Sequence, residues 1–126
     1  MSTRFYSRDH QWALKEGKRI RVGISDFAQA ELGEIAYVEL PPIGKRVSAG
    51  EMVCSIDTLK SSSEIYSPAS GTVVEVNNIL RQEEQCAIIN EDPLGKGWLF
   101  VIELKTIDEL DGLLSFEEYQ RFIQNG

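Results

Sequence analysis

The sequence predicts a mainly β protein, a small antiparallel sandwich or barrel with a few short helices at its periphery. Short runs rich in Val, Ile and aromatic residues alternate with clusters of Pro, Gly and Ser, which is typical of short strands joined by turns. The 126 residues, 42% of them hydrophobic, can bury one core, so we expect a single domain over residues 1–126. Six runs are expected to form strands: 20–24, 35–40, 52–58, 64–67, 72–77 and 98–104.

One short helix is expected after the first of these strands, over residues 26–32. Ser25 can cap its first turn by accepting a hydrogen bond from the main chain, and Gly33 can end it by adopting a positive φ. Three of its apolar residues are expected to face the sheet: Phe27, Ala30 and Leu32.

Two further short helices are expected near the C-terminus. The segment 106–109, Thr-Ile-Asp-Glu, has the form of a capping box, with Thr at the cap and Glu three positions later. A second helix start lies at 115–118, Ser-Phe-Glu-Glu. In the run that follows, Tyr119, Phe122 and Ile123 share one face. We expect both helices to pack on the β structure.

The charge of the chain argues against several classes of partner. The net charge is −7, and residues 22–102 alone carry a net charge of −7. An acidic surface repels phosphate groups, so we expect no nucleic acid and no anionic membrane as partner. The longest apolar stretch, 98–102, is too short to span a bilayer, and the first ten residues have no signal-peptide core. We therefore expect a cytoplasmic protein whose partners present basic surfaces.

The usual equipment for catalysis is sparse. Cys54 and Cys86 lie 32 positions apart and His10 is the single histidine, so we expect two free, buried or half-buried thiols and no metal site. Neither Cys54 nor His10 belongs to a recognisable hydrolytic arrangement. Gly95 and Gly97 precede a strand, which is the reverse of the order in a dinucleotide-binding loop. With no catalytic residue evident, the sequence favours a carrier or binding module over an enzyme.

Lys60 occupies a distinctive position between two expected strands. One strand runs toward it and another runs away, with small residues at 61–63, so Lys60 is predicted at the tip of a β-hairpin. A lone lysine at such a tip is ordinarily a solvated cation that discourages edge pairing. The residues around it therefore decide whether Lys60 has a function.

Those surroundings resemble the H proteins of the glycine cleavage system. That family carries its lipoyl lysine in a Glu-Ser-Val-Lys-Ala motif, followed by an acidic residue and a Ser-Pro-x-Ser-Gly turn. The matching residues here are Asp57-Thr58-Leu59-Lys60-Ser61, then Glu64 and 67–71. Glycines of the wider lipoyl and biotinyl family are matched by Gly44 and Gly71. Biotinyl relatives place Met on both sides of the lysine, where this chain has Leu59 and Ser61, so lipoate fits better than biotin.

The resemblance extends over nearly the whole chain. Further matching segments are His10-Gln11-Trp12, 22–29, 32–35, 38–41 and 90–98. It implies the lipoyl-domain-like fold, a barrel-sandwich hybrid of two antiparallel sheets, with one short helix in the N-terminal third and short C-terminal helices. Because the match begins within a few residues of Met1, we expect no organelle presequence.

The resemblance also implies a function. Lipoate would be attached covalently to Lys60, with Asp57, Leu59 and Ser61 as the recognition surroundings. The carrier would take an aminomethyl group from glycine decarboxylase to a tetrahydrofolate-dependent aminomethyltransferase, and dihydrolipoyl dehydrogenase would reoxidise it. A lipoate ligase, or a lipoyl or octanoyl transferase, would load it. We expect such a carrier to be a monomer.

Departures from the family pattern leave an alternative open. The family places the acidic residue of His-Glu-Trp near the aminomethyl cargo, where this chain has the neutral Gln11. Glu31 and Glu64 match other positions near that cargo cleft and could partly substitute, while Asp57 shortens the usual Glu. One alternative is a specialised H-protein-like lipoyl carrier, used for lipoate relay or for redox or regulatory modification. Another is an unmodified interaction module in which Lys60 is incidental.

Overall fold

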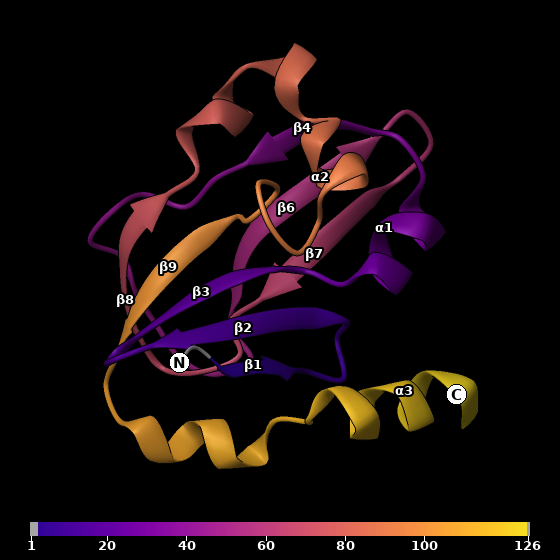
Figure 1. The fold of residues 1–126 in the computed structure, drawn as a ribbon. Helices are drawn as coiled ribbons and strands as arrows, with labels where there is room; N and C mark the ends of the chain where they lie inside the picture. Colours follow the sequence, from indigo (N-terminus) through magenta and orange to yellow (C-terminus); the bar gives the residue numbers. More distant parts are fainter. Residues whose placement is uncertain (1–2, 126) are drawn as a thin grey trace.

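The computed structural model describes residues 3–125, which form two antiparallel sheets with short helices around them (Figure 1). In chain order the elements are β1 (Thr3–Tyr6), β2 (Gln11–Glu16), β3 (Arg19–Ile24), α1 (Asp26–Leu32), β4 (Ile35–Glu39), β5 (Arg46–Val47), β6 (Met52–Thr58), β7 (Ser62–Tyr66), β8 (Gly71–Val76), η1 (Asn78–Arg81), η2 (Glu83–Gln85), α2 (Ile88–Glu91), β9 (Phe100–Leu104), η3 (Ile107–Gly112) and α3 (Phe116–Asn125). The η elements are 3₁₀ helices.

The two sheets form a sandwich and not a closed barrel. One sheet has the order β1-β2-β3-β9-β8-β5, and the smaller one has the order β4-β6-β7. All six expected strands are confirmed, with their boundaries shifted by up to two residues. Three strands were not predicted: β1, β2 and the two-residue β5. β5 exists only as a partner of β8, a contact that a local pattern does not contain.

β2 escaped prediction because both of its faces are covered. Ala13 belongs to the main core between the sheets, while its neighbour Trp12 belongs to a second cluster. Consecutive strand residues point to opposite faces, so the second cluster lies on the outer face of the six-stranded sheet. Its buried members are Tyr6, Trp12, Leu114 and Tyr119, and α3 supplies further apolar side chains to it. The result is a strand without the wet and dry alternation expected of a sheet surface.

The Trp12 ring also explains one glycine on the neighbouring strand. Gly23 is paired with Trp12, and a Cβ at this position would lie 2.6 Å from the indole. A larger residue at position 23 would force the ring out of the second cluster.

α1 begins and ends where the sequence indicates. The Ser25 hydroxyl accepts a hydrogen bond from the Ala28 amide at 3.1 Å, and Gly33 closes the helix with a φ of 81°. The predicted inner face is wrong in part. Ala28 and Leu32, four residues apart on one helix face, pack against the core, whereas Ala30 is exposed and Phe27 packs on the His10 ring.

The two C-terminal starts have different outcomes. At Ser115 a complete capping box forms, since the Ser115 amide donates to Glu118 and the Glu118 amide donates to the Ser115 hydroxyl. The box predicted at Thr106 is wrong. Thr106 caps a 3₁₀ helix, and Glu109 turns away to accept hydrogen bonds from the amide and hydroxyl of Ser70, each at 3.0 Å. Ser70, which is distant in sequence, thus replaces the Thr106 amide as the partner of the Glu109 carboxylate.

Candidate functional site

Lys60 lies at the tip of the hairpin formed by β6 and β7, as predicted. Asp57 is paired with Ser62, and beyond this pair the Thr58 amide donates to the Ser61 carbonyl at 2.9 Å. Leu59 and Lys60 alone complete the turn. The hairpin projects from the end of the molecule farthest from α3 (Figure 1).

The turn is closed by a hydroxyl and not by a glycine. The Thr58 Oγ1 accepts hydrogen bonds from the amides of Lys60, at 3.2 Å, and Ser61, at 3.1 Å. Among the described residues other than glycine, only His10 has a positive φ, so Leu59 and Lys60 keep ordinary backbone conformations. Thr58 was not singled out from the sequence. A hydroxyl residue two positions before the tip is the signal that identifies such a turn.

The side chains at the tip are open to solvent. Leu59 is 89% exposed, the highest value among the exposed large hydrophobic residues, and Lys60 is exposed beside it. Within residues 3–125 the ion pairs join Arg19 to Glu103, Arg21 to Glu16, and Lys45 to Glu51. None of these pairs involves Lys60, so no carboxylate of the described chain holds its amine.

Asp57 and Ser61 support the tip from its two strands. Asp57 accepts a hydrogen bond from the Ser62 hydroxyl, which ties the last residues of β6 to the first of β7. The Ser61 and Thr58 hydroxyls lie 3.3 Å apart, within hydrogen-bond distance. The residues expected around Lys60 are therefore brought together, and they order the main chain from which the lysine extends.

The three residues expected at a cargo cleft lie in different surroundings. Glu31 is exposed on α1 and Glu64 is exposed on β7, with the Tyr66 hydroxyl 3.5 Å from its carboxylate. Gln11 is only 1% exposed. Its amide, in the orientation that satisfies both polar atoms, donates to the Tyr66 carbonyl at 2.6 Å and accepts from the Tyr66 amide at 2.9 Å. No hydrogen bond within residues 3–125 joins any two of these three side chains.

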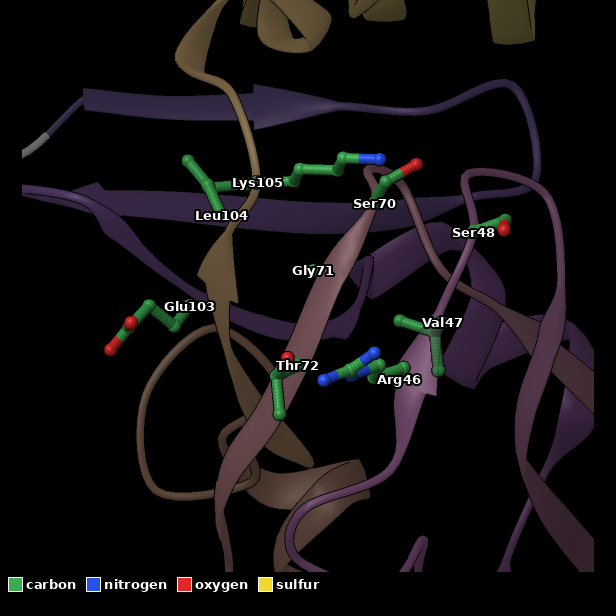
Figure 2. Close-up of a pocket in the computed structure, with 9 residues that line it drawn as sticks. All are labelled: Arg46, Val47, Ser48, Ser70, Gly71, Thr72, Glu103, Leu104 and Lys105. Atoms are coloured by element: carbon green, nitrogen blue, oxygen red, sulfur yellow. The ribbon is translucent and has the colours of Figure 1, made fainter.

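A small hollow of about 230 Å³ lies beside the hairpin tip. Its apolar wall includes Leu59 and Ala36, and three carboxylates line it as well: Glu34, Glu83 and Glu84. Another hollow, of about 510 Å³, lies elsewhere, over β5, β8 and β9 (Figure 2). In this hollow Arg46 lies near Thr72, and Lys105 lies near Ser70. None of these residues belongs to the Lys60 hairpin.

Both thiols are buried, as expected. Burial, with a smaller contribution from the nearby Glu39 carboxylate, raises the pKa of Cys54 to about 12. Burial also raises the pKa of Cys86. The reactive thiolate is therefore suppressed at both positions near neutral pH.

Two kinds of feature are absent from the described residues. Across residues 3–125, no group of three or more His, Cys, Asp or Glu side chains is arranged to hold a metal ion. No helix in that range is both long enough and apolar enough to cross a bilayer.

Comparison with known proteins identifies the family. The chain matches the family model described as glycine cleavage H-protein over residues 4–126. It is 49% identical over 119 residues to the glycine cleavage system H protein of Coprothermobacter proteolyticus, covering 94% of this chain and 92% of the relative. It is 45% identical over 121 residues to that of Geobacillus thermodenitrificans, covering 96% and 94%.

A solved structure gives the same result. The crystal structure of a glycine cleavage system H protein from Mycobacterium marinum superimposes with a TM-score of 0.83 at 36% identity, covering 98% of this chain and 96% of that one. Sequence and fold agree over nearly the whole chain. The chain therefore belongs to the glycine cleavage H-protein family.

Proposed function

We propose that this chain is a lipoyl-carrying shuttle of the glycine cleavage system, with lipoate attached through an amide to Lys60. The observation that carries the proposal is an exposed primary amine at the tip of a hairpin whose turn is closed by its own hydrogen bonds. An amide link needs a reachable amine, and Lys60 Nζ meets that requirement. When bound, the lipoyl group supplies the thiol and redox chemistry of the carrier.

The residues of the chain supply position. Thr58, Asp57 and Ser62 hold the main chain of the tip, so the point from which the arm extends is defined. The lysine side chain itself remains flexible and can reach several enzymes in turn. Acylation of the amine also removes one positive charge, so the net charge of the chain would change from −7 to −7 − 1 = −8.

The proposed cycle has three partners. The carrier receives the aminomethyl group from glycine decarboxylase and passes it to the tetrahydrofolate-dependent aminomethyltransferase, and dihydrolipoyl dehydrogenase reoxidises it. A lipoate ligase, or a lipoyl or octanoyl transferase, loads Lys60. The chain acts as a monomeric, cytoplasmic carrier of one domain and not as an enzyme. We retain Gln11, Glu31 and Glu64 as the proposed neighbours of the cargo.

An intact-mass measurement tests the attachment site. After incubation with lipoate–protein ligase, ATP and lipoate, the wild type should gain the mass of one lipoyl group, whereas Lys60→Arg should gain none. Lys105→Arg is the matched control, because Lys105 is also exposed, and it should gain one group. A lipoyl group on Lys60→Arg, or none on the wild type, would refute the proposal and favour the unmodified interaction module.

A second assay separates the shuttle from the specialised carrier. No finding favours a carrier used only for lipoate relay or regulation, and the family match supports the glycine cleavage role. The lipoylated wild type, mixed with glycine decarboxylase and labelled bicarbonate, should support exchange of the glycine carboxyl group. A fully lipoylated protein that supports no exchange would contradict the shuttle while leaving the attachment site intact.

A further inference from the structure

The Gln11 amide joins the two sheets at the base of the Lys60 hairpin. Gln11 is the first residue of β2 in the six-stranded sheet, and Tyr66 is the last residue of β7 in the smaller sheet. The amide satisfies both main-chain groups of Tyr66, with contacts of 2.6 and 2.9 Å. A residue of a neighbouring strand would make the same two bonds. One side chain thus takes the place of one step of strand pairing.

No strand pairing among the described strands satisfies the main-chain amide and carbonyl of Tyr66. β7 is an edge strand of its sheet, paired only with β6 among the described strands. The parity of the β6–β7 ladder makes Tyr66 face away from β6, so its amide and carbonyl need a partner from elsewhere. Both groups face the Gln11 side chain, which is only 1% exposed, and an unpaired polar atom at a buried position is costly.

Hydrogen bonds to Ser7 fix the main chain of Gln11. The main-chain carbonyl of Gln11 accepts a hydrogen bond from the Ser7 amide at 2.9 Å, and the main-chain amide of Gln11 donates to the Ser7 hydroxyl at 3.3 Å. The preceding residue, His10, has a φ of 68°, and its ring lies 2.8 Å from the Tyr119 hydroxyl. A positive φ is uncommon for a residue other than glycine, so the backbone just before Gln11 adopts a sparsely populated conformation.

We propose that Gln11 is a positioning residue whose amide clasps β7 to the six-stranded sheet and so sets the direction in which the Lys60 hairpin projects. Its importance for Lys60 rests on the function proposed above. The clasp requires a donor and an acceptor on one side chain, which an amide provides. An ionised carboxylate can accept from the Tyr66 amide but would face the Tyr66 carbonyl oxygen without a proton.

In the variant Gln11→Glu, the stabilising contact with Tyr66 should therefore depend on pH. Burial and the facing carbonyl should raise the pKa of the new carboxyl group in the folded state above its unfolded value. The folded state then binds more protons, so stability relative to the wild type should fall as the pH rises between these two values. Titratable groups near the clasp are Asp9, His10, Glu64, Tyr66 and Tyr119. The wild type shares all of them, so the two proteins differ only in the new carboxyl group and in its interactions with these neighbours.

Urea unfolding from pH 5 to pH 8 tests the clasp, with Gln11→Met as the variant that lacks both bonds. Gln11→Met should lower the folding equilibrium constant about tenfold or more at every pH. Gln11→Glu should approach the wild type near pH 5 and approach Gln11→Met near pH 8. The exposed Gln82→Glu carries the same change of charge and should show no such trend. A ratio of Gln11→Glu to wild type that does not depend on pH overturns the inference.

Amide hydrogen exchange and lipoylation test positioning. In Gln11→Met the Tyr66 amide should exchange at least about tenfold faster, with the Val22 amide in β3 changed less. An equal acceleration at both amides would indicate only global destabilisation and would overturn positioning. The KM for lipoylation should rise in Gln11→Met. An unchanged KM would overturn the part of the proposal in which Gln11 positions the Lys60 hairpin. Failure of the wild type to accept lipoate would refute the proposed function alone, because the exchange result does not depend on it.

Discussion

Thr58 shows how much one hydroxyl can do at the scale of a residue. It accepts from two consecutive amides and so closes a two-residue turn that contains no glycine. Two-residue hairpin turns usually rely on residues with positive φ. Here the Thr58 hydroxyl satisfies the turn amides, and the side chains of Leu59 and Lys60 remain exposed to solvent.

The variant Thr58→Val should loosen the tip without unfolding the protein. It keeps the shape of the side chain and removes the acceptor of two hydrogen bonds. Because the freed amides can bind water, the free energy of unfolding should fall by only about 0.5–1 kcal/mol. Hydrogen exchange at Lys60 and Ser61 should accelerate. Thr58→Ser is the control and should stay near the wild type. If Ser and Val lower stability equally, the hydroxyl is not responsible.

At the scale of elements, α3 is stabilised at its first turn by the Ser115–Glu118 capping box. Hydrogen bonds from Ser115 lower the pKa of the Glu118 carboxyl, with a smaller contribution from the charges of Arg121 and Arg8. The carboxylate form is therefore favoured in the folded state. Its stabilising effect is present above the unfolded pKa and is lost as the pH falls through the folded value.

Acid should therefore weaken the wild-type helix α3 more than that of Glu118→Gln. We expect hydrogen exchange in residues 116–125 to accelerate as the pH falls from 6 to 3, after correction for the intrinsic exchange rate. In Glu118→Gln the corrected acceleration should be smaller, since the amide does not titrate. Glu117→Gln, an exposed neighbour, is the control and should retain the wild-type response. Identical profiles for all three proteins would contradict this role of the box.

Elements with local signals were predictable, and elements made by distant partners were not. α1 has its cap and its terminal glycine within nine residues, and the β6–β7 hairpin lies within one short segment. β5 forms through pairing with β8, and β2 is buried on both faces. The candidate site divides in the same way: the position of Lys60 was predictable, whereas the bonds between Gln11 and Tyr66 join residues far apart in sequence.

At the scale of the molecule, the acidic charge has a local concentration near the tip. Glu34, Glu83 and Glu84 line the hollow that Leu59 borders. A basic enzyme surface would be attracted to this end of the carrier, because opposite charges accelerate encounter more than they strengthen the final complex.

Ionic strength should therefore affect the carrier's use by aminomethyltransferase. Raising the salt from about 0.05 M to about 0.3 M should raise the KM for the lipoylated carrier several-fold, because screening shortens the range of attraction. A triple variant with Gln at 34, 83 and 84 should have a higher KM at low salt and a weaker response to salt. A matched triple variant at Asp108, Asp111 and Glu117 keeps the net charge equal and should respond like the wild type. A wild-type KM that does not depend on salt would contradict this electrostatic role.

The burial of both cysteines has a consequence for a carrier that bears a dithiol. An oxidised lipoyl arm on Lys60 would carry a cyclic disulfide, and an accessible thiolate could attack one of its sulfurs, forming a mixed disulfide and releasing the other sulfur as a thiolate. Cys54 and Cys86 are the only cysteines of the chain, and both lie beneath the surface with raised thiol pKa values. A lipoyl arm on Lys60 would therefore meet no accessible thiol of its own chain. Its disulfide would then stay available to the enzymes of the proposed cycle.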